Sequence, residues 1–262
     1  MKHNYLKHLF TALLLLCTTA AFAHDFEVDG IYYNVLSEED KTVEVTYKGS
    51  SNSEYSNEYT GSVVIPESVI YNGVDYSVTS IGSAAFKGCK SLTNVIIPNS
   101  VTSIGVSAFN DCNYLTNVTI GNNVTSIGNY AFCNCNLTSI TFPSSVTSIG
   151  EEAFYHCTLL TSVVIPSSVT SIGNGVFSNC IGLTSVVIED GVTNFGDCAF
   201  SGCTGLTSVT IPNSVTTIGN SAFYGCSGLT SIVIPNSVTS IGWRAFFNSP
   251  KVRLLNWDFV KC

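Results

Sequence analysis

Cysteine is the residue type in this chain with the greatest potential for chemistry. A thiol can form a disulfide, ligate a metal ion or act as a nucleophile, and the 262-residue sequence contains 11 cysteines. Seven of them recur at intervals of 22 or 23 residues, each three residues after a phenylalanine: Cys89, Cys112, Cys135, Cys157, Cys180, Cys203 and Cys226. This regular interval decides which of the three chemistries is possible.

The interval predicts that the seven cysteines stack in a ladder, one in each repeat. Neighbouring rungs of a strand stack lie roughly 4.8 Å apart with parallel Cβ directions, which suits the disulfide torsion poorly. A metal ion needs ligands that converge on one point, whereas a ladder spreads them along an axis. We therefore expect buried side chains that act as small hydrophobic residues. Cys133, Cys198 and Cys262 fall outside the ladder and are candidates for exposed thiols.

Histidine is too scarce to support a catalytic apparatus. Beyond the first 23 residues the sequence contains only His24 and His156, and His156 occupies a variable position of the repeat. Nucleophilic catalysis needs a base that is held beside the nucleophile and oriented by a third group. We therefore predict a protein that is not an enzyme and that has no cofactor and no metal site.

The cysteines belong to a unit of about 23 residues that reads V-T-S-I-G-x-x-A-F-x-x-C-x-x-L-T-S-V-x-I-P-x-S. The glycine of this unit can be followed through eight copies: Gly82, Gly105, Gly128, Gly150, Gly173, Gly196, Gly219 and Gly242. A segment this short cannot bury its apolar side chains alone, so successive units must stack around one core. The sequence predicts a repeat solenoid, mainly β, in which about eight coils of 22–23 residues form a leucine-rich-repeat superhelix.

Each unit also predicts the path of one coil. The run from Leu183 to Ile188 has the L-x-x-L-x-L pattern of leucine-rich repeats, and stacked copies of it give a parallel sheet on the concave side. By the period of two, Val186 and Ile188 should point inward, and Ser185 and Val187 outward. The Val-Thr-Ser-Ile-Gly piece should return as a second short strand. The Ala-Phe-x-x-Cys piece should form a short helical or 3-10 turn with its phenylalanine inside.

The outward positions of the predicted concave sheet are the first candidate binding site. They form two rows: Asn94, Asn117, Ser139, Ser162, Ser185, Ser208 and Ser231, and beside them Ile96, Thr119, Thr141, Val164, Val187, Thr210 and Val233. Side chains on a rigid sheet lose little entropy on contact, which favours protein binding. The competing interpretation is that β-branched residues simply suit strands.

Aromatic residues at variable positions supply a second candidate site, because aromatic side chains are common interface anchors. The candidates are Tyr130, Tyr155, Tyr224 and Trp243. The competing interpretation is that they shield gaps between coils or belong to the end of the array.

A further row is threonine in eight units: Thr79, Thr102, Thr125, Thr147, Thr170, Thr193, Thr216 and Thr239. We expect hydroxyl ladders between coils that stabilise the stacking. Ordered water, as on an ice-binding surface, is the alternative, but the pattern lacks an alternating Thr-x-Thr.

The ends of the chain differ from the array. Residues 1–23 combine a basic start, an apolar run and a small-residue cleavage pattern, which predicts a secretory signal peptide. Residues 24–77 hold 11 of the 18 carboxylates and predict a β-rich cap with a first irregular repeat, including hairpins between 30 and 47 and at Asn72-Gly73. The regular array covers 78–249. From 250 to 262 the sequence abandons the repeat, which predicts a short C-terminal cap or a truncated end.

The recurring unit resembles the BspA-like leucine-rich repeat family of bacterial surface proteins. The likeness covers about Val63 to Phe247 and rests on Ala-Phe, Cys, Ile-Pro and Ile-Gly at fixed offsets. It departs from the pattern at Leu137, which stands one residue early, and at Gly121 and Glu189, which replace proline. The resemblance implies an exported, adhesin-like protein, at the cell surface or secreted, that binds host matrix or another cell through a protein partner. It brings no catalytic residues.

Charge and composition narrow the expected partners. The chain has 18 acidic and 10 basic residues and no basic patch, so we expect no nucleic-acid partner. No further apolar stretch of membrane-spanning length follows residue 23. The hydroxyl-rich face leaves a glycan-binding module as the alternative function, and a passive structural spacer of a surface layer as a third. The short C-terminal segment also predicts weak self-association through that end.

Overall fold

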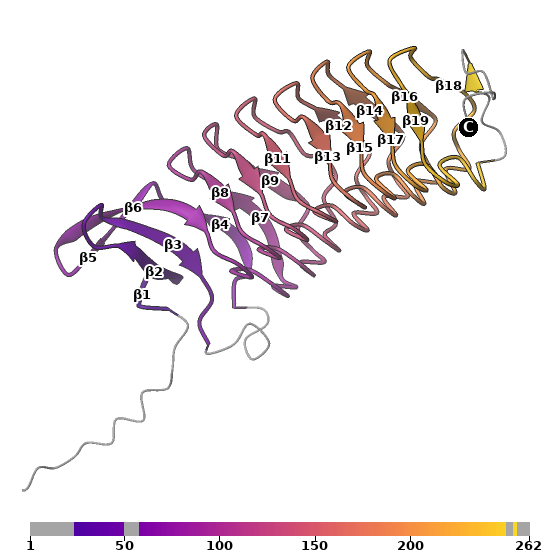
Figure 1. Ribbon diagram of the computed structural model, residues 1–262. Coiled ribbons are helices and arrows are strands. Elements are labelled where there is room, and N and C mark those ends of the chain that lie inside the picture. Colours follow the sequence, from indigo (N-terminus) through magenta and orange to yellow (C-terminus); the bar gives the residue numbers. More distant parts are fainter. Residues whose placement is uncertain (1–23, 50–57, 250–253, 256–262) are drawn as a thin grey trace, which may run out of the picture.

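Strands and turns stacked along one axis make up the described chain. The computed structural model describes residues 24–49, 58–249 and 254–255. Figure 1 shows the coils following one another from the N-terminal to the C-terminal end. The described residues contain strands and turns and no helix, so the predicted β-solenoid is confirmed. The predicted signal peptide, residues 1–23, lies outside the described residues.

Two strand ladders run along the array. The first, here called the long-strand face, is the sheet predicted for the concave side: β4 (Gly61–Val64), β7 (Leu92–Ile96), β9 (Asn117–Thr119), β12 (Ser162–Ile165), β14 (Ser185–Ile188), β16 (Ser208–Thr210) and β18 (Ile232–Val233). The second consists of strands that end just before the repeated glycine: β6 (Val74–Ile81), β8 (Ser103–Ile104), β10 (Ser126–Ile127), β11 (Ser148–Ile149), β13 (Ser171–Ile172), β15 (Asn194–Phe195), β17 (Thr217–Ile218) and β19 (Ser240–Ile241).

The strands pair in parallel and in the register of the repeat. Ser126 lies opposite Ser103 and Ser148, and Val187 lies opposite Val164. The eight strands of the second ladder confirm the prediction of about eight coils. Seven full turns therefore separate the first of these strands from the last.

The Ala-Phe-x-x-Cys segment closes each coil with a turn that is neither helical nor 3-10, contrary to the expectation from the sequence. Ser107 and Asp111 have positive φ angles of 55° and 61°, which a right-handed helix does not contain. Ala108 donates its amide hydrogen to Gly105 in its own coil, at 3.3 Å. Ser107 and Phe109 instead donate to carbonyl oxygens of the next coil, at 2.8 and 2.7 Å. The helical prediction is wrong because every second amide of the turn donates its hydrogen bond to the next coil.

Phenylalanine rings form a continuous stack inside the solenoid. Neighbouring ring centroids lie 4.8–5.6 Å apart with interplanar angles of 2–13° along this series: Phe86, Phe109, Phe132, Phe154, Phe177, Phe200, Phe223 and Phe246. The first seven rings are fully buried. Aromatic pairs at this separation contribute about 0.5–1.5 kcal/mol beyond their area burial. The predicted inward direction of these residues is confirmed.

The ladder cysteines are buried and donate hydrogen bonds to the preceding coil. Sγ of Cys112 lies 2.9 Å from the carbonyl oxygen of Phe86, and the same contact recurs at 3.1–3.2 Å for Cys135, Cys157, Cys180, Cys203 and Cys226. No disulfide joins the described cysteines. Burial raises the pKa of the Cys157 and Cys226 thiols to about 12. The prediction that the ladder cysteines are buried is confirmed.

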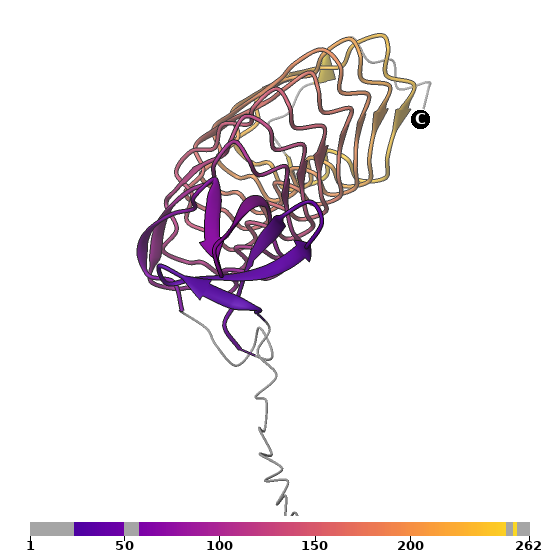
Figure 2. The ribbon, with the colours of Figure 1, turned by 90° about the vertical axis from the view of Figure 1, so that its left-hand side faces the viewer.

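An antiparallel sheet covers part of the N-terminal end of the solenoid (Figure 2). It consists of β1 (Phe26–Val28), β2 (Ile31–Ser37) and β3 (Thr42–Thr46), and β3 pairs in parallel with β6 of the first coil. β5 (Ser68–Tyr71) forms a hairpin with β6 through Asn72-Gly73. Both hairpins predicted from the sequence are confirmed, and the sheet continues the second ladder beyond the first coil.

The stack continues at the C-terminal end beyond the point where the sequence leaves the repeat. Ser249 occupies the ladder position of cysteine, and its Oγ donates a hydrogen bond to Phe223 at 2.8 Å. β20 (Leu254–Leu255) pairs in parallel with β18, with Leu254 opposite Ile232. The sequence leaves the repeat here, but backbone pairing does not need the consensus side chains, so β20 still adds to the ladder. Residues 250–253 and 256–262, including Cys262, lie outside the described residues.

The repeated glycine lets neighbouring coils approach closely. A Cβ atom on Gly219 would lie 2.5 Å from the carbonyl carbon of Gly196 in the preceding coil. At Gly173 the nearest atom to an added Cβ would be the carbonyl oxygen of Ile149, at 3.2 Å. The steric cost of a side chain therefore differs between coils.

We expect Gly219→Ala to lower the free energy of unfolding by about 1–3 kcal/mol, because the added methyl group meets backbone that cannot move away. Gly173→Ala is the matched control and should have a smaller effect. Urea titration followed by circular dichroism measures both variants, and equal destabilisation would contradict the steric explanation.

Candidate functional site

Both predicted rows of outward side chains lie on the long-strand face. Pairing places Asn94 beside Asn117 and aligns Ser162, Ser185 and Ser208 in adjacent strands. Of the fourteen side chains in the two rows, twelve are exposed, and Asn94 and Ser185 are half-buried. The rows thus form a continuous strip of side chains on one surface of the solenoid.

Along each strand of this face, successive side chains point alternately to the core and to solvent. Val186 and Ile188 are 2% and 4% exposed, whereas Val187 between them is 50% exposed. Ile96, Val164 and Val233 show the same outward direction, with 39–50% of each side chain exposed. Half-exposed aliphatic side chains are therefore held in fixed positions along the face.

The strand beneath the strip is missing at one coil. Ser139 and Thr141 are exposed, but no strand forms around them between β9 and β12. In this coil Leu137 follows Cys135 by two residues, whereas the usual separation is three. The amide nitrogen of Thr138 lies 3.2 Å from the threonine carbonyl oxygen that accepts its hydrogen bond in the preceding coil. The corresponding distance for Thr184 is 2.9 Å. The missing residue therefore weakens the ladder where the two rows cross this coil.

Threonine hydroxyls stabilise the stacking through two ladders. In the row predicted from the sequence, Oγ1 donates to the carbonyl oxygen of the equivalent threonine one coil earlier, at 3.0–3.3 Å, from Thr102, Thr125, Thr147, Thr193, Thr216 and Thr239. A second row, which the sequence analysis missed, makes the same contact from Thr116, Thr138, Thr161, Thr184 and Thr207. These hydrogen bonds support the stacking interpretation of the threonine row.

Serine hydroxyls on the long-strand face have a different role. Ser139, Ser162, Ser185, Ser208 and Ser231 make no side-chain hydrogen bond within the described residues. Each hydroxyl can both donate and accept. The face therefore offers a row of hydrogen-bonding groups beside a row of aliphatic ones.

The electrostatic character of the face differs from that of its surroundings. Neither row contains a charged residue, and the sequence has no lysine or arginine between Lys90 and Arg244. The acidic residues of this stretch lie in turns and loops, as Asp197 and Glu189 do. The face is neutral, and the edges beside it carry the negative charge.

The four predicted aromatic candidates lie on the edge formed by the turns around the Ala-Phe-x-x-Cys segments, here called the turn edge, and not on the long-strand face. Trp243 is 68% exposed and Tyr130 37% exposed, whereas Tyr155 and Tyr224 are half-buried. The guanidinium carbon of Arg244 lies 3.9 Å from the centroid of the Trp243 ring. The structure therefore does not bring the aromatic candidates together with the two rows.

A shallow acidic hollow on the turn edge was not found by sequence reasoning. It has a volume of about 320 Å³ and is lined by Glu152, Tyr155, Asn174, Gly175, Ser178, Asp197 and Cys198. The hollow opens at Gly175, because the equivalent positions of the adjacent coils carry a side chain and this one does not. No sequence motif marks such a gap. Among the described residues, no three His, Cys, Asp or Glu side chains converge to hold a metal ion.

Comparison with known proteins identifies the repeat. The model of the BspA type leucine rich repeat region matches residues 79–207 and 200–258, in six copies. A leucine-rich repeat protein of T. pallidum is 31% identical, with a TM-score of 0.66 over 78% of this chain and 90% of that one. A leucine-rich repeat protein of Bacteroides ovatus is 32% identical, with a TM-score of 0.61 over 88% of this chain and 70% of that one.

No curated protein sequence matches the chain. Within the described residues, no helix has the length and apolar character needed to cross a bilayer.

Thiol reactivity tests the placement of the cysteines. Cys198 is the exposed cysteine of the described residues, and Cys133 is buried. Partial burial, and then the charges of Asp197 and Glu152, raise the pKa of Cys198. The thiolate fraction at pH 8 is thus below that of an ordinary cysteine, and alkylation should speed up as the pH rises.

We expect iodoacetamide to modify native protein at Cys198 and to modify the ladder cysteines only after unfolding. Asp197→Asn should accelerate labelling of Cys198 at pH 8, because it lowers the raised pKa while keeping an oxygen for the Asn220 amide. Peptide mass spectrometry reads each site separately. Native labelling of Cys180 at the rate of Cys198, or a disulfide between ladder cysteines, would refute the assignment.

The short coil offers a test of how the face is built. Inserting one serine between Asn136 and Leu137 restores the usual spacing. A strand should then form from Ser139 to Thr141. Amide hydrogen exchange there should slow down relative to the parent protein. The same insertion between Ile181 and Gly182 disturbs a regular coil and should accelerate exchange instead; acceleration in both proteins would show that coil length does not explain the gap.

Proposed function

This chain belongs to the BspA-type leucine-rich repeat family, and from that premise we propose that it binds a protein partner through the long-strand face. The partner belongs to the host extracellular matrix or to the surface of another cell. The family and the fold support an interaction role, and the identity of the face is our own assignment.

The observation that carries the proposal is the pairing of two rows with complementary chemistry. Half-exposed aliphatic side chains such as Val164 and Val187 alternate with serine hydroxyls that have no partner within the described chain. Burial of the aliphatic row in a complex contributes roughly 25 cal/mol per Å², and the hydroxyls can pair with polar groups of the partner. Because the backbone is fixed by stacking, few side-chain rotamers are lost on binding.

A glycan is the second candidate ligand. The unpartnered serine hydroxyls favour it, since sugars are recognised by hydrogen bonds from such groups. The absence of aromatic side chains from both rows disfavours it, because Trp243 and Tyr130 lie on the turn edge. A passive spacer is the third interpretation and predicts no ligand at all.

The remaining features of the proposed function follow from the sequence. The protein is exported by residues 1–23 and acts at the cell surface or after secretion. We propose a binding role and not an enzymatic one, since His24 and His156 are the only histidines beyond residue 23 and leave little material for a catalytic base. No nucleic acid is expected, and weak self-association through the C-terminal end stays part of the proposal.

Substitution on the face tests the proposal. Val187→Glu should weaken binding to a captured matrix protein at least about tenfold, because a carboxylate would be buried without a partner. Val106→Glu is the matched control, since Val106 is 48% exposed but lies on the turn edge. Surface plasmon resonance on purified matrix proteins, together with a glycan array, provides the measurement.

Each outcome separates the candidate functions. Equal loss with both variants would show that the face is not the binding surface. Capture by glycans and not by proteins would select the second candidate, and no capture on either support would select the spacer.

A further inference from the structure

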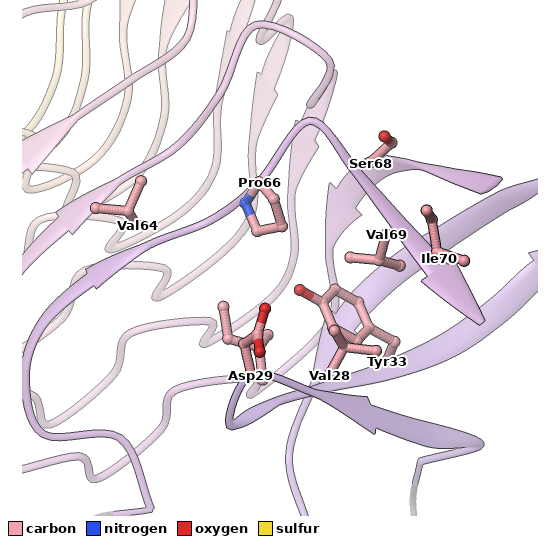
Figure 3. A pocket seen from close by; sticks show the side chains of 9 residues that line it. Val28, Asp29, Tyr33, Val64, Pro66, Ser68, Val69 and Ile70 are labelled. Carbon is pink, nitrogen blue, oxygen red and sulfur yellow. The ribbon is translucent and has the colours of Figure 1, made fainter.

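One strand of the long-strand face has an open edge that borders a groove. Within the part of the chain that the structure describes, β4 is the terminal strand of the sheet β4-β7-β9 and pairs with β7 alone. Two adjoining hollows of about 390 and 310 Å³ follow its other edge, and both are lined by Asp29, Ile31 and Val64. The turn between β1 and β2 forms the opposite wall (Figure 3). Hollows of this size are typical of ligand sites.

The main chain of β4 presents hydrogen-bonding groups to this groove. Gly61 and Ile65 donate their amide hydrogens toward β7, at 2.8 and 3.0 Å. Main-chain groups alternate in direction along a strand, so those of Ser62 and Val64 point to the open edge. Neither residue makes a main-chain hydrogen bond there within the described residues. An exposed edge of this kind is a template for another strand.

Polar groups without partners lie along the same groove. Tyr33 is fully buried, and its hydroxyl, which Figure 3 shows directed into the hollow, makes no hydrogen bond within the described chain. Burial, and then the charge of Asp29, raise the pKa of Tyr33, so the hydroxyl remains a donor. At the other end of the groove, Oε1 of Glu58 is buried without a partner, while its Oε2 accepts from the amide of Lys48.

The charge and the apolar surface of the groove define what fits it. Asp29 makes no ion pair with the described residues, so a cationic side chain can approach it without competing with one. Val64 and Ile70 are 60% and 69% exposed and flank the larger hollow. The occupant must therefore combine main-chain donors and acceptors with apolar side chains and a positive charge.

We propose that this groove binds an extended segment of another protein, which pairs with the open edge of β4 and places a lysine or arginine beside Asp29. Pairing through the main chain supplies affinity, and the alternate side chains supply selectivity, as in other cases of strand addition. The site uses the edge of the sheet and not its exposed face. It is therefore independent of the proposed function, and either assignment can fail alone.

A labelled peptide, Ac-Thr-Val-Lys-Val-Thr-Val-NH2, tests the proposal by fluorescence anisotropy on the full chain. N-methylation of alternate amides removes the donors needed for strand pairing but keeps the charge, and should abolish binding. Asp29→Asn should weaken binding about two- to fivefold, as expected for a surface ion pair. Asparagine tolerates the positive φ of 51° at this position. Asp190→Asn, a charge change elsewhere on the array, is the matched control and should have no effect.

Hydrogen exchange of the Ser62 and Val64 amides gives a second measurement that needs no variant. Both amides should become protected when the peptide is added, whereas those of β14 and β16 should not change. Val64→Pro removes one edge donor in a position where proline is tolerated and should reduce binding. Equal affinity of the N-methylated peptide, or unchanged exchange at Ser62 and Val64 with millimolar peptide, would overturn the proposal. Unchanged peptide binding in Val187→Glu would show that the groove is separate from the face.

Discussion

Hydrogen bonding between successive coils is the constraint on which the rest of this structure depends. A coil of 22–23 residues is too short to satisfy its own backbone, so its amides and carbonyls must find partners one coil away. The turn shows this requirement directly, because Phe109 donates to Ala131 and Phe132 to Ala153, at 2.7 and 2.8 Å. Side chains are then restricted column by column. Glycine is needed where backbones nearly touch, and phenylalanine and cysteine fill the space that the turns enclose.

The same constraint separates residues that serve the fold from residues that are available for function. A column that faces the core repeats with little change, and even Ser249 reproduces the hydrogen bond of the cysteines it replaces. The threonine hydroxyls that precede the strands of both ladders are engaged with the preceding coil. What remains available is the serine hydroxyls and aliphatic side chains of the outward rows, together with exposed turn positions. Candidate binding groups are therefore recognised by the absence of a structural task, and not by a chemical motif.

Sequence periodicity predicted the parts of this fold that repeat. The inward Val186 and Ile188, the outward Val187 and the buried Cys180 all follow from position within the unit. The turn conformation did not follow, because positive φ angles fall on residues as varied as Ser107, Glu152 and Arg244 and carry no glycine signal. The groove beside β4 was also missed. It joins Asp29 to Val64, which are far apart in the sequence, and Asp29 lies outside the repeat.

A solenoid has two ends, and at each end some backbone groups have no neighbouring coil. The described residues resolve this differently on the two sides: β3 continues the second ladder at the N-terminal end, whereas β20 continues the long-strand face at the C-terminal end. The N-terminal segment therefore leaves β4 as an open edge while covering β6 beside it. An uncovered edge is a hazard that proteins usually reduce with charge, and here Asp29 and Glu58 line the groove along it. Acidic residues at this position would repel an identical edge and favour a cationic strand. The uncovered edge would therefore select its partner by charge.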